Sequence, residues 1–191
     1  MASTGSYNDL LNRPTIPSKT SQLTNDSNYV AKDAGGNVTI AGTLTAAKVV
    51  NAYYNDYAEF FPRGEASEPG DIIALADTEK ESYVKATEGS VMAVGIHSDE
   101  YAQIIGGETD ENGNVDIEMV LQKYIPVALA GRVHVKYYGM AKAGMKVVPS
   151  EIPGVGRAFA DGDKEENVMG RIVEGDTFQN VRKVKVMVRR Q

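Results

Sequence analysis

Asn55, Asp56 and Glu59 are the residues whose types and spacing best fit chemistry on a peptide bond. A carboxylate beside a strained peptide bond can act as base or acid and promote attack by a nearby side chain or by water. Such a site needs carboxylates whose pKa values are pushed apart by burial or mutual repulsion. Asp56 and Glu59 are three positions apart and would share a site if the backbone turned. The alternative is a turn at Asn55-Asp56, with Glu59 hydrogen-bonded at the entrance of a domain.

A second group of candidate residues is the run His97-Ser98-Asp99, which has the residue types of a hydrolase triad. Adjacent residues of a strand point to opposite faces, so these three cannot form a triad among themselves. We favour a surface turn at the end of a strand. His97 and His134 lack helical i, i+4 spacing and a nearby third ligand, so we predict no metal site and no cofactor.

The composition excludes several classes of protein. The chain has 191 residues, of which 42% are hydrophobic and 24% charged, as in a soluble folded protein. It has no cysteine, which rules out disulfides, thiolate zinc sites and cysteine nucleophiles. The net charge is −6 without a basic field, so we expect neither a nucleic acid nor a membrane partner. No signal peptide is visible.

The chain divides into three segments by composition. Residues 1–36 are polar and have too little apolar content to fold alone, so we predict an extended arm. Residues 37–50 alternate apolar and small polar residues around Gly42, which predicts two short strands, a β stalk too short to be stable by itself. Residues 51–191 predict a globular domain. Neighbouring copies of the chain are the natural support for the arm and the stalk.

Short strand-like runs recur between turn signals throughout residues 51–191. The clearest runs are 71–76, 83–86, 91–97, 115–121, 125–129, 132–137, 146–148, 156–160, 168–173 and 181–189. Asn112-Gly113 is the strongest two-residue hairpin signal. We find no amphipathic helix longer than about two turns. The pattern predicts an all-β chain whose globular part is a β-barrel or sandwich-like domain.

Aromatic residues concentrate at the start of this domain. They are Tyr53, Tyr54, Tyr57, Phe60 and Phe61. Stacked rings suit the faces of sugars, so the cluster could be a carbohydrate platform. The alternative, which we favour, is a core or a subunit interface at the junction with the stalk.

Several stretches resemble parts of phage tail fibres and appendages. Residues 7–17 (YNDLLNRPTIP) and 20–26 (TSQLTND) resemble a linker in tail and fibre proteins of phages and prophages of Gram-positive bacteria, and 36–44 (GNVTIAGTL) resembles a repeat that leads into fibre C-termini. Five further stretches resemble the intramolecular chaperone domain of phage appendage proteins, also called the G2 peptidase domain. They are residues 55–61 (NDYAEFF), 68–71 (EPGD), 94–99 (VGIHSD), 126–133 (PVALAGRV) and 142–145 (KAGM).

This resemblance covers nearly the whole chain. It implies a homotrimer whose C-terminal domain brings three stalks into register and, in some members, cuts itself off once near the stalk junction. Asn55, Asp56 and Glu59 are the catalytic candidates for such a cut. The implied location is the phage virion, or the bacterial cytoplasm before lysis for a prophage product, with other tail proteins as partners. The alternative function is a receptor-binding module that recognises a host surface polysaccharide or protein.

Overall fold

The computed structural model describes residues 15–19, 22, 32–38, 40, 42–48, 55–109 and 116–188. The chain divides into two compact units, Met1–Leu44 and Thr45–Gln191. None of the described residues between 37 and 48 lies in a strand of this single chain. The β stalk therefore stays a prediction for an assembled form, in which other copies would supply the strand partners.

The second unit is built almost entirely from short strands, so the predicted all-β class is confirmed. In chain order its elements are β1 (Asp56–Pro62), β2 (Ile72–Leu75), β3 (Tyr83–Lys85), β4 (Met92–His97), β5 (Gln103–Ile105), α1 (Ile117–Lys123), β6 (Tyr124–Tyr137), β7 (Lys146–Pro149), β8 (Gly156–Ala158), η3 (Glu165–Asn167), β9 (Gly170–Ile172) and β10 (Arg182–Val188).

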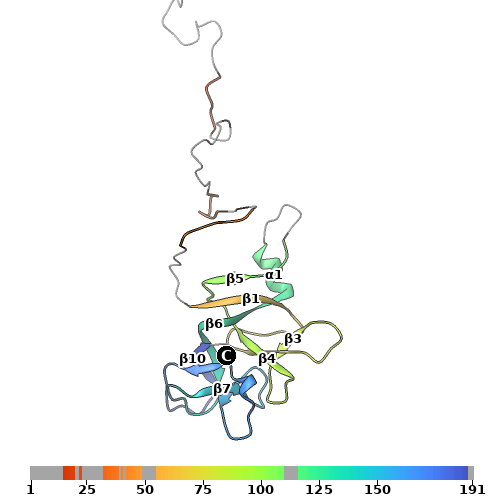
Figure 1. The fold of residues 1–191 in the computed structure, drawn as a ribbon, viewed down its shortest axis with the longest axis vertical. Helices are drawn as coiled ribbons and strands as arrows, with labels where there is room; N and C mark the ends of the chain where they lie inside the picture. Colours follow the sequence, from red (N-terminus) through yellow and green to blue (C-terminus); the bar gives the residue numbers. More distant parts are fainter. Residues whose placement is uncertain are drawn as a thin grey trace, which may run out of the picture. The chain divides into compact units, whose positions relative to one another are not determined.

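The long strand β6 joins the two halves of this domain (Figure 1). Its second half pairs with β10, and the ladder continues through β9, β7 and β8 back to β6, which closes a five-stranded barrel. Its first half pairs with β1 on one side and β4 on the other. From there the sheet extends to β2 and β3 beyond β4, and to β5 beyond β1.

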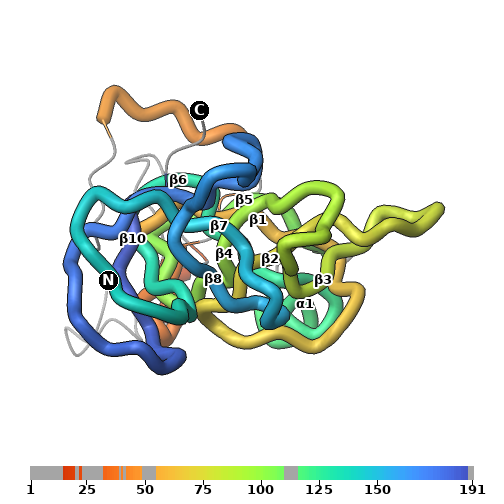
Figure 2. The backbone as a smooth tube through the Cα atoms, turned by 90° about the horizontal axis from the view of Figure 1, so that it is seen from below, coloured from red at the N-terminus to blue at the C-terminus, as the bar shows by residue number. Residues whose placement is uncertain are grey.

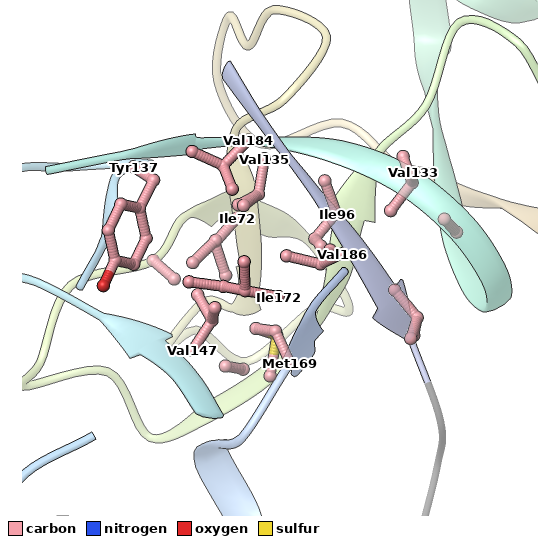
Figure 3. Close-up of a cluster of buried hydrophobic side chains, with 14 of the residues drawn as sticks. Ile72, Ile96, Val133, Val135, Tyr137, Val147, Met169, Ile172, Val184 and Val186 are labelled. Carbon is pink, nitrogen blue, oxygen red and sulfur yellow. The ribbon is translucent and has the colours of Figure 1, made fainter. Parts of the chain in front are cut away.

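Alternating valines fill the barrel. Val133 and Val135 of β6 face inward with Val184 and Val186 of β10, and the strands are in register at Val135↔Val184 and Val133↔Val186 (Figure 3). Full burial of a side chain of this size contributes about 1.5–3 kcal/mol. The same cluster also holds Ile72, Ile96, Tyr137, Val147, Met169 and Ile172. A second cluster under β1 contains Ile73, Tyr83, Ile125 and Val127.

Gly131 lies where β6 leaves the sheet for the barrel. It pairs with Asp56 of β1 and with Val188 of β10. Its φ of +107° is in the region that favours glycine. A Cβ at this position would lie 2.4 Å from the carbonyl oxygen of Asn55. The close crossing of these two backbones therefore requires a residue without a side chain.

Most predicted strands of the domain match observed ones, but one predicted strand is wrong. Residues 115–121 were expected to be extended, whereas residues 117–123 form the helix α1. The Asp116 carboxylate accepts a hydrogen bond from the Met119 amide at 3.1 Å, which caps the helix, and Val120 is its buried residue. The hairpin expected at Asn112-Gly113 lies outside the described residues.

Candidate functional site

Hydrogen bonds fix the backbone where the first strand, β1, begins. The Asn55 carbonyl accepts a hydrogen bond from the Arg132 amide at 3.1 Å, and the Asn55 side-chain amide donates to the carbonyl of Glu100 at 2.9 Å. The carbonyl of Asp56 accepts from the amide of Ala102 at 2.9 Å. The carbonyls of both Asn55 and Asp56 are therefore held by backbone amides of neighbouring segments.

Asp56 forms a buried pair with Ser98. Their exposed fractions are 3% and 1%. The Ser98 hydroxyl donates to Oδ1 of Asp56 at 3.1 Å, and the Ser98 amide is held by the carbonyl of Pro126 at 2.9 Å. Oδ2 of Asp56 is buried and has no hydrogen-bond partner among the described residues. A buried carboxylate oxygen without a partner is costly, and such a group is a candidate for function.

The pKa of Asp56 is raised from 3.8 to about 6, mainly by burial, with a smaller contribution from the nearby negative charges of Asp99 and Glu100. The hydrogen bond from Ser98 opposes these effects. A carboxylate with a pKa close to neutrality is well suited to accept a proton and return it at physiological pH. Asp56 has this property and lies directly beside the Asn55–Asp56 peptide bond.

The structure does not bring Glu59 to this carboxylate. Residues 55–56 do not turn, because Asp56 is already in β1, and Glu59 is three positions along the same strand. Asp56, Ala58 and Phe60 are buried on one face of β1, so Glu59 points to the other. Within one chain, Asp56 and Glu59 do not form a shared site, and a catalytic role for Glu59 stays a prediction.

The strand ends at His97 and an exposed bend follows at Asp99, as expected, but His97 and Ser98 themselves are buried, so their expected place at the surface is wrong. As expected, they do not form a triad, because the two side chains take different partners. Nδ1 of His97 lies 3.0 Å from the Ser67 hydroxyl, whereas Ser98 bonds to Asp56. Burial lowers the pKa of His97 to about 4, with a further contribution from Arg63. His97 is therefore neutral at physiological pH.

Two of the aromatic residues near the junction, Phe60 and Phe61, pack against other rings of the domain. Phe60 is buried and meets Tyr124 edge-on, with ring centroids 6.4 Å apart. Phe61 meets Tyr83 in the same way at 4.6 Å. Tyr57 is the more exposed ring, and Tyr53 and Tyr54 lie outside the described residues. This packing favours the interpretation of Phe60 and Phe61 as core residues.

Ser98 is the partner that the sequence did not reveal. It is 42 positions from Asp56 and meets it because β4 and β1 both pair with the first half of β6. No local pattern reports such a contact. The one available signal was a small polar residue directly after an apolar strand.

We expect Asp56→Asn to make the protein more stable at neutral pH. The folded pKa of Asp56 is raised, so the folded state binds more protons than the unfolded state between about pH 4 and 6. Stability from this group therefore falls as pH rises through that window. The amide keeps an acceptor for Ser98 but carries no charge. Urea unfolding at pH 7 should give a gain of about 1–3 kcal/mol.

The pH dependence of this gain is the control. The gain in the free energy of unfolding should shrink as pH falls from about 6 to 4, because wild-type Asp56 becomes protonated in this range. His97 titrates with the opposite sign, since its folded pKa is lowered, but both proteins retain it and its effect cancels. A gain that is the same at pH 4 and pH 7 would contradict a titrating Asp56.

The described residues hold no group of three or more histidines, aspartates or glutamates placed to bind a metal ion. Within the same residues, no helix has the length and apolarity needed to cross a membrane.

Comparison with known proteins gives a likeness of fold. No protein-family model and no curated protein matches the sequence. The chain is similar to the crystal structure of pre-mature bacteriophage phi29 gene product 12, with a TM-score of 0.52 and 17% identity over 81% of this chain and 23% of that one. It also aligns with the C-terminal fragment of that protein at a TM-score of 0.49 and 19% identity, over 70% of this chain and all of the fragment. The chain thus spans about a quarter of the pre-mature phage protein and shares the fold of that part.

Proposed function

We propose that this chain is the C-terminal part of a phage tail appendage protein, and that its domain assembles three copies so that their arms and stalks fold in register. The observation that carries the proposal is the fold shared with bacteriophage phi29 gene product 12, a tail appendage protein. The sequence resemblance to appendage chaperone domains supports it independently. The protein then acts in the virion, with other tail proteins as partners.

A chaperone domain would overcome a specific physical obstacle to the folding of three identical stalks. Three identical chains that wind in parallel lose much conformational entropy before any contact compensates for it, and wrong registers are nearly equal in energy. A domain that trimerises first raises the effective concentration of the stalk strands and sets their register. The described residues between 37 and 48 have no strand partner in the single chain, which is consistent with this dependence.

A truncated chain tests where trimerisation resides. We expect a protein that begins at residue 45 to have a trimeric mass in light scattering, and a peptide of residues 1–50 to stay monomeric. A monomeric 45–191 protein alongside a trimeric full chain would place trimerisation in the arm and stalk, and would contradict a chaperone role for the domain.

We further propose that Asp56 supports a single self-cleavage at the Asn55–Asp56 bond. The carboxylate takes a proton from the Ser98 hydroxyl or from a water, and the activated oxygen attacks the Asn55 carbonyl carbon. The Arg132 amide, which donates to that carbonyl, stabilises the developing negative charge. The proton passes to the amine of Asp56 as the bond breaks. If Ser98 attacks, water then hydrolyses the resulting ester.

A further inference from the structure

One outer face of the barrel carries a row of basic side chains. Side chains alternate along each strand, and the buried residues of β6 and β10 fill the interior, so the residues between them point outward. In-register neighbours on β7 and β9 continue the same face. We call this set the basic face; it consists of Arg132, His134, Lys136, Lys146, Arg171, Lys183 and Lys185.

Residues of like charge are directly opposite one another on this face. Lys183 pairs in register with Lys136, and Lys146 with Arg171. Like charges at directly opposed positions destabilise a sheet. The chain as a whole carries a net charge of −6, so this group of positive charges is opposite in sign to the net charge of the chain. Carboxylates of the same chain already offset Lys136 and Lys146, so a negatively charged partner would act mainly on Lys183 and Arg171.

Part of the basic face is already neutralised within the chain. Lys136 contacts Asp71 at 2.7 Å and Glu68 at 3.0 Å, Lys146 forms an ion pair with Glu165, and Lys185 lies 3.6 Å from Glu174. Among the described residues, no carboxylate is within ion-pair distance of Lys183 or Arg171. These two cations are therefore the centre of the charge left for a partner.

The loop between β2 and β3 carries the opposite charge. Asp77, Glu79 and Glu81 are exposed there, with Lys80 as the single cation, and we call residues 77–81 the acidic tip. The tip has a defined shape, because the amide of Ala76 bonds to the carbonyl of Ser82 at 2.9 Å, which closes its base. Figure 2 shows this loop extending away from the rest of the domain.

Within one copy the acidic tip lies away from the β10 part of the basic face, since β10 and β3 are well separated in both Figure 1 and Figure 2. A surface that contacts a different, complementary surface of the next copy makes a heterologous contact, and such contacts close into rings when the rotation permits. We propose that the acidic tip of one copy docks on the basic face of the next copy, centred on Lys183 and Arg171, and that three such contacts close the trimer. This inference rests on the proposed trimer.

Charge reversal and charge exchange test this interface in the full chain. We expect the double variant Arg171→Glu with Lys183→Glu, and separately Asp77→Lys with Glu79→Lys, to raise the concentration at which the trimer dissociates at least tenfold in light scattering. In the fourfold variant that carries both exchanges, the concentration at which the trimer dissociates should return to within about threefold of the wild-type value, because opposite charges again face each other. Wild-type trimers should also weaken as salt rises.

A matched control separates a local contact from net charge. Lys123→Glu with Lys164→Glu changes the net charge by the same amount at exposed positions away from the basic face, and should leave dissociation unchanged. If wild type is monomeric, the proposed trimer fails and this inference with it. If wild type is trimeric and both reversals leave it unchanged, only the interface is wrong. Loss of binding to immobilised polyglutamate in such unchanged trimers would instead identify the face as a site for an external polyanion.

Discussion

Gly131→Ala should lower the free energy of unfolding by about 3–4 kcal/mol. Two costs add. The φ of +107° is unfavourable for a residue with a Cβ, at about 1–2 kcal/mol. The new Cβ would also lie 2.4 Å from the carbonyl oxygen of Asn55 and 2.7 Å from Cα of Asp56, and both neighbours are backbone atoms that cannot rotate away.

Gly162→Ala is the matched control for this substitution. Gly162 has a similar φ of +98°, but a Cβ there would have no neighbour within 4 Å. Only the conformational cost remains, so we expect a loss of about 1–2 kcal/mol in urea unfolding. Equal losses of unfolding free energy in the two variants would contradict the close crossing of β1 and β6 at Gly131.

Asp56→Ala should abolish self-cleavage, because it removes the group that accepts the proton. Loss of a general base typically slows a reaction by about 10²–10⁴-fold. The measurement is mass spectrometry of the purified, denatured chain over time, since it detects any cut and locates it. In wild type, the rate should rise with pH through the Asp56 pKa of about 6, as the carboxylate becomes the dominant form.

Three further variants sharpen this test. Ser98→Ala separates attack by the Ser98 hydroxyl, which it would stop, from attack by water, which it would leave. Asp99→Ala removes a nearby charge without removing the base and should retain cleavage. Glu59→Ala should also retain cleavage if the chemistry belongs to Asp56, because Glu59 faces the other side of β1. Cleavage that persists in Asp56→Ala would contradict the site, and a wild-type chain that stays intact at 20.6 kDa would contradict processing altogether.

The sequence predicts the barrel strands well for a clear physical reason. Val133 and Val135, like Val184 and Val186, alternate with polar residues, so the inward face of each strand is visible in the sequence. The sequence predicts β1 poorly. Phe60 and Phe61 are apolar neighbours on opposite faces, each packed in a separate place, and this removes the alternation.

Only part of the candidate site could be predicted from the sequence. Asp56 could be named from its type and its place at the end of the polar segments. Its burial, its raised pKa and its bond to Ser98 all depend on the pairing of β1 and β4 with β6, which no local pattern encodes. Likewise, residues 117–123 contain apolar residues compatible with either a strand or a helix, and the capping hydrogen bond to Asp116 favours the helix.

The mass of the intact full-length assembly tests the central claim most directly. We predict that light scattering of the purified Asp56→Ala chain, in which self-cleavage is blocked, gives three times the 20.6 kDa chain mass at physiological salt, with a single species on size-exclusion chromatography. A mass of 20.6 kDa over the accessible range of concentrations would contradict the account, because a monomeric domain cannot bring three stalks into register.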